Sequence, residues 1–63
     1  MKLFRTYIND DHVFTSDSLR VIFTDLSHIG VPDCSMPSLE SRYIKMPIEI
    51  TFEDMNIKIE MEE

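Results

Sequence analysis

The sequence predicts an α+β fold: a small antiparallel β-sheet of three to four strands, including a C-terminal hairpin, with one α-helix packed on its apolar face. Three observations lead to this prediction. Apolar residues alternate with period two near the C-terminus, a stripe of helical period lies within residues 16–29, and residues 2–8 are rich in β-branched and aromatic side chains. A length of 63 residues corresponds to a single small domain, 1–63.

The C-terminal third predicts a β-hairpin over residues 43–61 that turns at 53–56. Even positions from Ile44 to Phe52 are apolar, and the odd positions between them are not large and apolar. Beyond Phe52 the apolar positions are odd: Ile57, Ile59 and Met61. A straight strand cannot change its buried face, so the polar residues in between must form a turn. Pro47 has no N–H to give to a ladder, so we expect an unpaired edge beside it.

The length of this turn sets the pairing of charged residues on the outer face. With a four-residue turn Phe52 lies opposite Ile57, and both apolar sets then share one face. The same register places Glu49 directly opposite Glu60, and like charges in this position destabilise a sheet by roughly 0.2–1 kcal/mol. A sequence optimised for stability alone would avoid this pair. The outer face is therefore interpreted either as a solvated face whose charge aids solubility and protects the edge from aggregation, or as a binding surface.

The N-terminal segment predicts a first hairpin. Residues 2–8 form the first strand, with Phe4, Thr6 and Ile8 on one face. Residues 9–12 are turn formers, because short polar side chains hydrogen-bond the local backbone and tolerate left-handed geometry. Residues 12–15 then return as a short strand, which is expected to bring Tyr7 near Phe14.

Residues 17–29 are the best helix candidate. The predicted N-cap is Ser16, and Gly30 is expected at the left-handed position after the last turn, with Pro32 preventing continuation. A strand over 19–24 is the competing interpretation, and the caps at both ends favour the helix. Its apolar stripe consists of Leu19, Ile22, Phe23, Leu26 and Ile29.

Residues 32–41 are predicted to be a connection that Met36 and Leu39 pin to the core. They contain two prolines and three serines and show no periodicity. A single helical turn that begins at Ser38 is the alternative for part of this segment.

The negative charge is concentrated near the C-terminus. The chain has a formal net charge of −6, of which residues 48–63 carry −5 and residues 1–47 carry −1. Binding to a nucleic-acid backbone requires a basic surface, so direct nucleic-acid binding is not expected. An acidic surface favours a basic protein partner, including one that itself binds nucleic acid.

No pattern in the sequence predicts an enzyme, a cofactor or a metal. The single glycine is a helix-cap candidate, so a glycine-rich phosphate loop is excluded. Cys34 with His12 or His28 could form a nucleophile and base, but a lone loop cysteine is more often incidental. The adjacent Asp10, Asp11 and His12 are better explained as a solvated turn than as metal ligands.

We therefore expect a small acidic protein–protein interaction protein rather than an enzyme. The leading hypothesis is a viral or phage-type inhibitor that acts in the cytoplasm, that of the host if viral, and occupies a basic nucleic-acid-binding surface as a DNA mimic. Alternate residues of a strand are about 7 Å apart, similar to successive phosphates. The alternative is a small subunit or homodimer that associates through an exposed edge strand, and no membrane span is expected. The predicted partner-binding residues are Glu49, Glu53, Asp54, Glu60, Glu62 and Glu63.

Overall fold

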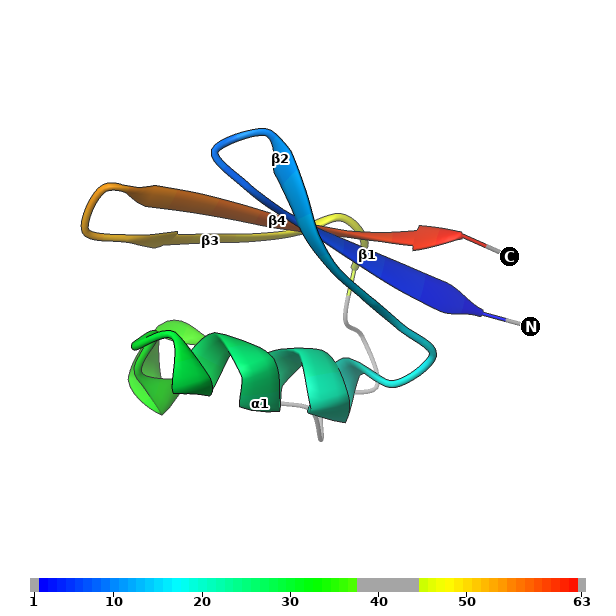
Figure 1. Cartoon of the computed structure of the whole chain (residues 1–63), viewed down its shortest axis with the longest axis horizontal. Coiled ribbons are helices and arrows are strands. Elements are labelled where there is room, and N and C mark those ends of the chain that lie inside the picture. Colours follow the sequence, from blue (N-terminus) through cyan, green and yellow to red (C-terminus); the bar gives the residue numbers. More distant parts are fainter. Residues whose placement is uncertain (1, 38–44, 63) are drawn as a thin grey trace.

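The computed structural model describes residues 2–37 and 45–62, and it contains one antiparallel sheet, one α-helix and a short 3₁₀ turn (Figure 1). The strand order is β2-β1-β4-β3, so the first and last strands form the centre of the sheet. This architecture confirms the predicted α+β fold. The elements are β1 (Leu3–Ile8), β2 (Asp11–Ser16), α1 (Leu19–His28), η1 (Asp33–Ser35), β3 (Ile48–Phe52) and β4 (Met55–Glu62).

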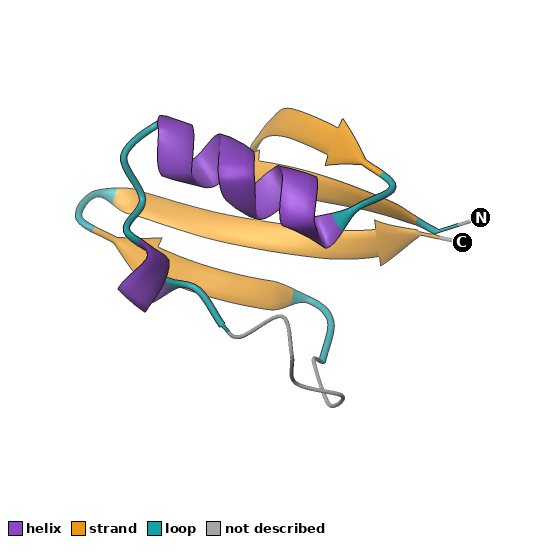
Figure 2. Cartoon of the chain, turned by 90° about the horizontal axis from the view of Figure 1, so that it is seen from below, coloured by secondary structure: helices purple, strands orange, loops and turns teal. Residues whose placement is uncertain are grey.

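The molecule has two layers, with α1 lying across one face of the sheet (Figures 1 and 2). Alternate strand residues face the helix, and the intervening residues, mostly polar, lie on the opposite face. No described helix covers that opposite face, which we call the open face. The core between the layers consists of Phe4, Ile22, Phe23, Leu26, Val31, Ile48, Ile50, Ile57 and Ile59.

The helix ends as the sequence predicts, in a Schellman motif. Gly30 has a φ of 106°, which favours glycine because it has no Cβ. The N–H of Gly30 donates to the carbonyl of Ser27, and the N–H of Val31 donates to the carbonyl of Leu26. Val31 and Leu26 are both buried, so the apolar contact that accompanies this motif anchors the end of the helix in the core.

The predicted start of the helix is wrong by two residues. The helix begins at Leu19 with Ser18 in the N-cap position, rather than at Asp17 with Ser16 as the cap. The hydroxyl of Ser16 instead accepts a hydrogen bond from the N–H of Ser18 at 3.1 Å. Ser16 ends strand β2 opposite Phe4, and this pairing in the sheet prevents it from starting the helix. The described helices include none long and apolar enough to cross a membrane.

The first hairpin has a two-residue turn and a bulge. Asn9 and Asp10 have φ values of 50° and 70°, the pattern of a type I′ turn, and both residue types tolerate it. The register shifts between Thr6 and Tyr7, so Tyr7 lies opposite His12 and Thr6 lies opposite Phe14. The prediction that Tyr7 lies near Phe14 is corrected by this extra residue.

The second hairpin has a shorter turn than predicted. Phe52 pairs with Met55, so the turn consists of Glu53 and Asp54, and the predicted turn at 53–56 is wrong. Glu53 takes the left-handed conformation with a φ of 52°. Two- and four-residue turns place the same residues on the inner face, which is why the parity of the apolar residues could not distinguish them.

The ends of the C-terminal hairpin also differ from the prediction. Strand β3 begins at Ile48 and is an edge strand, as expected from Pro47. Residues 43 and 44, which the sequence places in this strand, lie outside the described residues. Met61 was expected in the core but is 40% exposed, because β3 ends its pairing with β4 at Ile59.

The connection after the helix contains η1, a 3₁₀ turn at Asp33–Ser35 that the sequence did not indicate. Met36 packs against the core as predicted. Leu39 and the alternative helical turn at Ser38 lie outside the described residues.

Candidate protein-binding surface

The open face of the sheet carries charges of both signs in register. Tyr7 of β1 lies opposite Lys58 of β4, which lies opposite Glu49 of β3. In the next pair along β4, Glu60 lies opposite Arg5 of β1. The predicted pairing of Glu49 with Glu60 is therefore wrong, because the two-residue turn shifts the β3–β4 register and places Lys58 opposite Glu49. Glu60 has a base opposite it through the separate pairing of β4 with β1.

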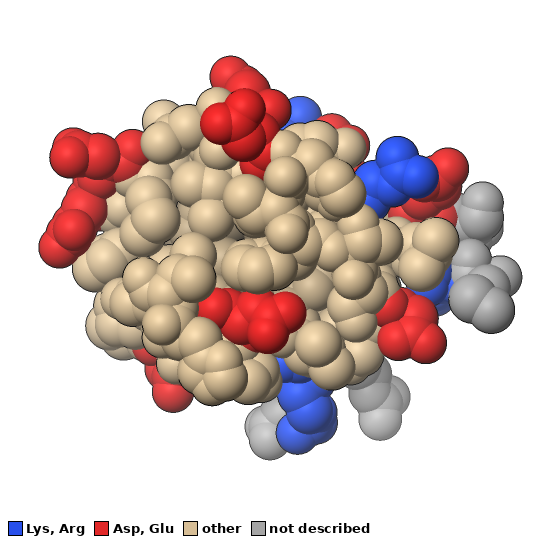
Figure 3. All heavy atoms as spheres, viewed as in Figure 1, with Lys and Arg blue, Asp and Glu red and all other residues tan. Residues whose placement is uncertain are grey.

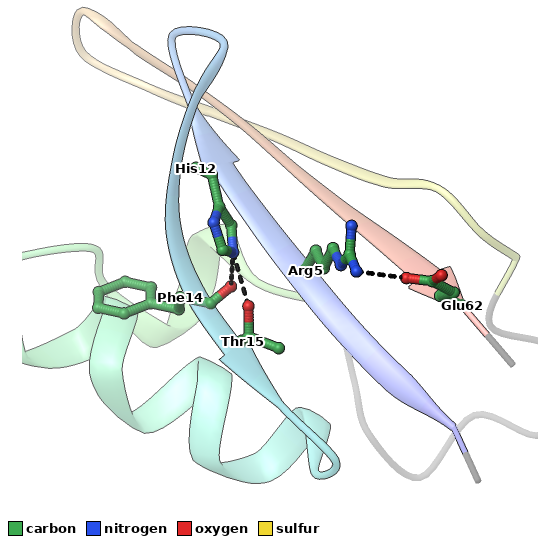
Figure 4. A network of polar contacts seen from close by, with 5 residues as sticks. All are labelled: Arg5, His12, Phe14, Thr15 and Glu62. Atoms are coloured by element: carbon green, nitrogen blue, oxygen red, sulfur yellow. Dashed lines mark hydrogen bonds and ion pairs between the residues drawn. The ribbon is translucent and has the colours of Figure 1, made fainter.

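Two of the predicted binding residues are held in ion pairs on this face. Glu62 accepts from the guanidinium of Arg5 at 2.7 Å (Figure 4), and Glu60 accepts from the ammonium of Lys58 at 3.3 Å. Both pairs are exposed, so each contributes about 0–1 kcal/mol to stability. Their functional consequence is larger, since a carboxylate beside a base presents less negative charge to a partner.

The observed register predicts that a charge reversal at Glu60 destabilises the sheet. Glu60→Lys is expected to lower the free energy of unfolding by a few tenths of a kcal/mol, up to about 1, because the new lysine lies opposite Arg5 and beside Lys58. Urea unfolding of the variant and of wild type measures the change. Glu60→Gln is the control, since it removes the ion pair without adding repulsion. A more stable Glu60→Lys variant would contradict the register.

Four of the described acids lie at the end of the sheet that carries both hairpin turns. Ile8 lies opposite Asp11 in one hairpin and opposite Ile57 in β4, so the β1–β2 turn and the β3–β4 turn lie at the same end. Figure 3 shows carboxylates over both turns, at the top and at the left. We call the four acids of these turns and their first flanking position the acidic end: Asp10, Asp11, Glu53 and Asp54.

Two hydrogen bonds fix the two hairpins to each other at the acidic end. The N–H of Asn9 donates to the carbonyl of Asn56 at 2.9 Å, and the N–H of Asn56 donates to Oδ1 of Asn9 at 3.0 Å. These bonds continue the β1–β4 pairing beyond Ile8. The turns therefore have a fixed relative position, and their carboxylates form two groups at one end of the sheet (Figure 3).

The acidic end differs from Glu60 and Glu62 of β4 in its ion pairing. Among the residues that the structure describes, the ion pairs are those of Glu62 with Arg5 and of Glu60 with Lys58. The carboxylates of the acidic end have no described base as an ion-pair partner. Their charge is therefore not offset by an ion pair, which also holds for Asp17, Asp25, Asp33 and Glu49 among the described acids.

The open face also contains a shallow depression of about 260 Å³. It lies over β4 between β1 and β3, with Tyr7 on one side and Glu49 on the other. This volume is below the roughly 300–1,000 Å³ of pockets for drug-sized ligands. The lining residues are Tyr7, Asp10, Glu49, Ile50, Thr51, Asn56, Ile57 and Lys58.

The residues considered for catalysis and metal binding are either held in local contacts or lie in different elements of the described structure. Nε2 of His12 is 3.1 Å from the carbonyl oxygen of Phe14 and 2.6 Å from Oγ1 of Thr15 (Figure 4). Its ring packs against that of Tyr7, with centroids 5.5 Å apart. Cys34 is exposed in η1. Within residues 2–37 and 45–62, no three His, Cys, Asp or Glu side chains are grouped to hold a metal ion.

Part of the acidic end was predicted from the sequence, and part was not. Glu53 and Asp54 were predicted, but their neighbours Asp10 and Asp11 were assigned only to a solvated turn. The missing information was that β1 and β4 are adjacent, which joins the two turns at one end. Glu63, the last predicted binding residue, lies outside the described residues.

Comparisons with protein-family models, with curated proteins and with solved structures found no match to this chain.

Proposed function

We propose that this protein is a non-enzymatic binding protein that docks its acidic end on a basic surface of another protein. One observation carries the proposal: the four carboxylates of the acidic end lie on two turns that are hydrogen-bonded together, without a described base to pair with them. A fixed cluster of unpaired charge accelerates association with a surface of opposite charge and penalises acidic partners.

The partner class that fits this charge best is a protein that binds nucleic acid. Such proteins have basic surfaces that neutralise phosphates, and a compact acidic protein can occupy the same surface. The binding protein would then act as an inhibitor, by competition with the nucleic acid. The proposed competition depends on the acidic end, because Glu49 and Glu60 in the middle of the sheet lie opposite bases and not opposite each other.

Two variants of equal charge test where the binding energy lies. Glu53→Asn with Asp54→Asn removes two charges from the acidic end, and asparagine suits the positive φ of position 53. Glu60→Gln with Glu62→Gln removes two charges that are already ion-paired. For a partner captured from a cell lysate, we expect the first variant to weaken binding about tenfold or more and the second by about threefold or less.

Titration at 0.1 M and 1 M salt, with and without the partner's nucleic acid, completes this test. We expect affinity to fall at high salt, because the screening length shortens from about 10 Å to about 3 Å. We also expect the nucleic acid and the protein to compete. Salt-independent affinity, or equal loss of affinity in the two variants, would refute docking through the acidic end.

A second candidate function is supported by the edges of the sheet. The β2 edge is irregular because of its bulge, whereas β3 is a regular edge strand that pairs on one side, with β4, in the described part of the chain. A second copy could add to β3 and form a homodimer with a continuous sheet. Sedimentation at micromolar concentration distinguishes the two candidates, since this one requires a dimer mass.

A further inference from the structure

We propose that the depression on the open face receives an arginine side chain of the partner. This inference rests on the proposed function and names the group that the acidic surface recognises. It starts from the arrangement of side chains over β4. Tyr7, Lys58 and Glu49 form a row across three neighbouring strands, and Thr51 and Asn56 form the next row toward the acidic end.

The position of Lys58 leaves the depression accessible to a cation. Its ammonium lies 3.3 Å from the carboxylate of Glu60, which is two residues further along β4 and away from the acidic end. Glu49 lies opposite Lys58, yet the ion pair of this lysine is with Glu60. The one base of the lining is therefore already paired with a carboxylate, which offsets part of its repulsion of an incoming cation.

The carboxylates of the lining flank this space on both sides. Glu49 of β3 lies in the row of Tyr7, whereas Asp10 lies in the turn three residues after Tyr7. Their backbones are separated by two strand spacings of about 4.8 Å each across the sheet and by about 10 Å along the strands. Both residues are exposed and without an ion pair to a described base. A cation that enters the depression is attracted by both carboxylates.

A guanidinium fits the remaining groups better than an ammonium does. The ring of Tyr7 is half-buried and lines the depression, and the His12 ring of β2 contacts it at an interplanar angle of 46°. A planar guanidinium can stack on this ring and donate to carboxylates on two sides, which the smaller and more strongly hydrated ammonium of lysine cannot do. Asn56 and Thr51 supply further oxygen acceptors at the floor.

The experiment uses the intact chain and three capped peptides of the form acetyl-Gly-X-Gly-amide, with X as arginine, lysine or citrulline. Amide chemical shifts of the ¹⁵N-labelled protein report where each peptide binds. We expect the arginine peptide to shift the amides of Tyr7, Thr51 and Lys58 with saturation in the millimolar range, about 1–10 mM. The lysine peptide should bind more weakly, and neutral citrulline should cause no saturable shift.

Two single-charge variants locate the site. Glu49→Gln removes a carboxylate of the depression, and Glu62→Gln removes one that lies outside it and is paired with Arg5. We expect Glu49→Gln to weaken the arginine peptide about three- to fivefold, the upper range for an exposed ion pair, and Glu62→Gln to leave it unchanged. Tyr7→Leu should reduce the preference for arginine over lysine, whereas Tyr7→Phe should retain it.

Other outcomes overturn the inference. Equal effects of the two glutamate substitutions, or saturable shifts confined to the acidic end, would show that arginine is attracted by general acidity and not by the depression. Failure of this site is distinguishable from failure of the proposed function. Partner binding that is lost in the Glu53→Asn, Asp54→Asn variant but retained in Glu49→Gln would leave docking by the acidic end intact and remove the arginine site.

Discussion

Ile59→Ala is expected to lower the free energy of unfolding by about 2–5 kcal/mol, among the largest losses expected for a single core substitution in this chain. Ile59 is fully buried in β4, opposite Thr6 on one side and Ile48 on the other. Truncation of a buried isoleucine costs about 2–5 kcal/mol. A chain of this length has a total stability of about 3–9 kcal/mol on a scale of 0.05–0.15 kcal/mol per residue. The substitution therefore removes a large part of the stability.

Thermal and urea unfolding followed by circular dichroism measures this loss. Met61→Ala on the same strand is the matched control, because Met61 is 40% exposed and its truncation should cost less than about 1 kcal/mol. If Ile59→Ala melted within a few degrees of wild type, β4 would not be the central strand of the sheet. Similar losses in the two variants would place Met61 in the core, as its parity alone had indicated.

Thr6→Val is expected to stabilise the protein by about 1–2 kcal/mol. Thr6 is fully buried in β1, and its hydroxyl has no hydrogen-bond partner in the described structure. A buried polar group without a partner costs about 1–3 kcal/mol, and valine has nearly the same shape without the hydroxyl. Valine also favours strands, so the backbone should accept it.

A differential scan of both proteins measures the effect. In a domain of this size 1 kcal/mol shifts the melting temperature by roughly 4–8 °C, so an increase of at least this order is expected. Thr51→Val on the exposed side of β3 is the control and should change stability by no more than about 0.5 kcal/mol. A Thr6→Val variant less stable than wild type would show that the hydroxyl is satisfied in solution, for example by a buried water.

Local patterns in the sequence were sufficient for the α-helix, the four strands and most of their buried positions, with Ile29 and Met61 as exposed exceptions. The stripe of helical period and Gly30 predicted α1 and its Schellman motif, because both signals lie within a few residues of each other. The change of parity after Phe52 likewise predicted the inward positions of Ile57 and Ile59. The start of the helix was missed because Ser16 and Ser18 are both good caps, and only pairing of Ser16 with Phe4 decides between them.

The register and the strand order depend on interactions that the sequence does not display. Nothing in a glutamate indicates that Glu53 adopts a positive φ, so the two-residue turn and the Glu49–Lys58 pair could not be chosen over the longer turn. The pairing of β1 with β4 has no local signal at all. The acidic end and the depression both depend on this pairing, so the sequence could indicate an acidic protein but not the place where its charge is concentrated.

The central position of β1 and β4 also has a consequence for how the chain reaches its fold. Each hairpin can form early, because its strands are joined by a two-residue turn. The step that unites the hairpins must bring together the two strands that lie farthest apart along the sequence, and closing such a large loop carries an entropic cost that local contacts cannot offset. We therefore expect this closure to determine the folding rate, and the hydrogen bonds between Asn9 and Asn56 to form only after it.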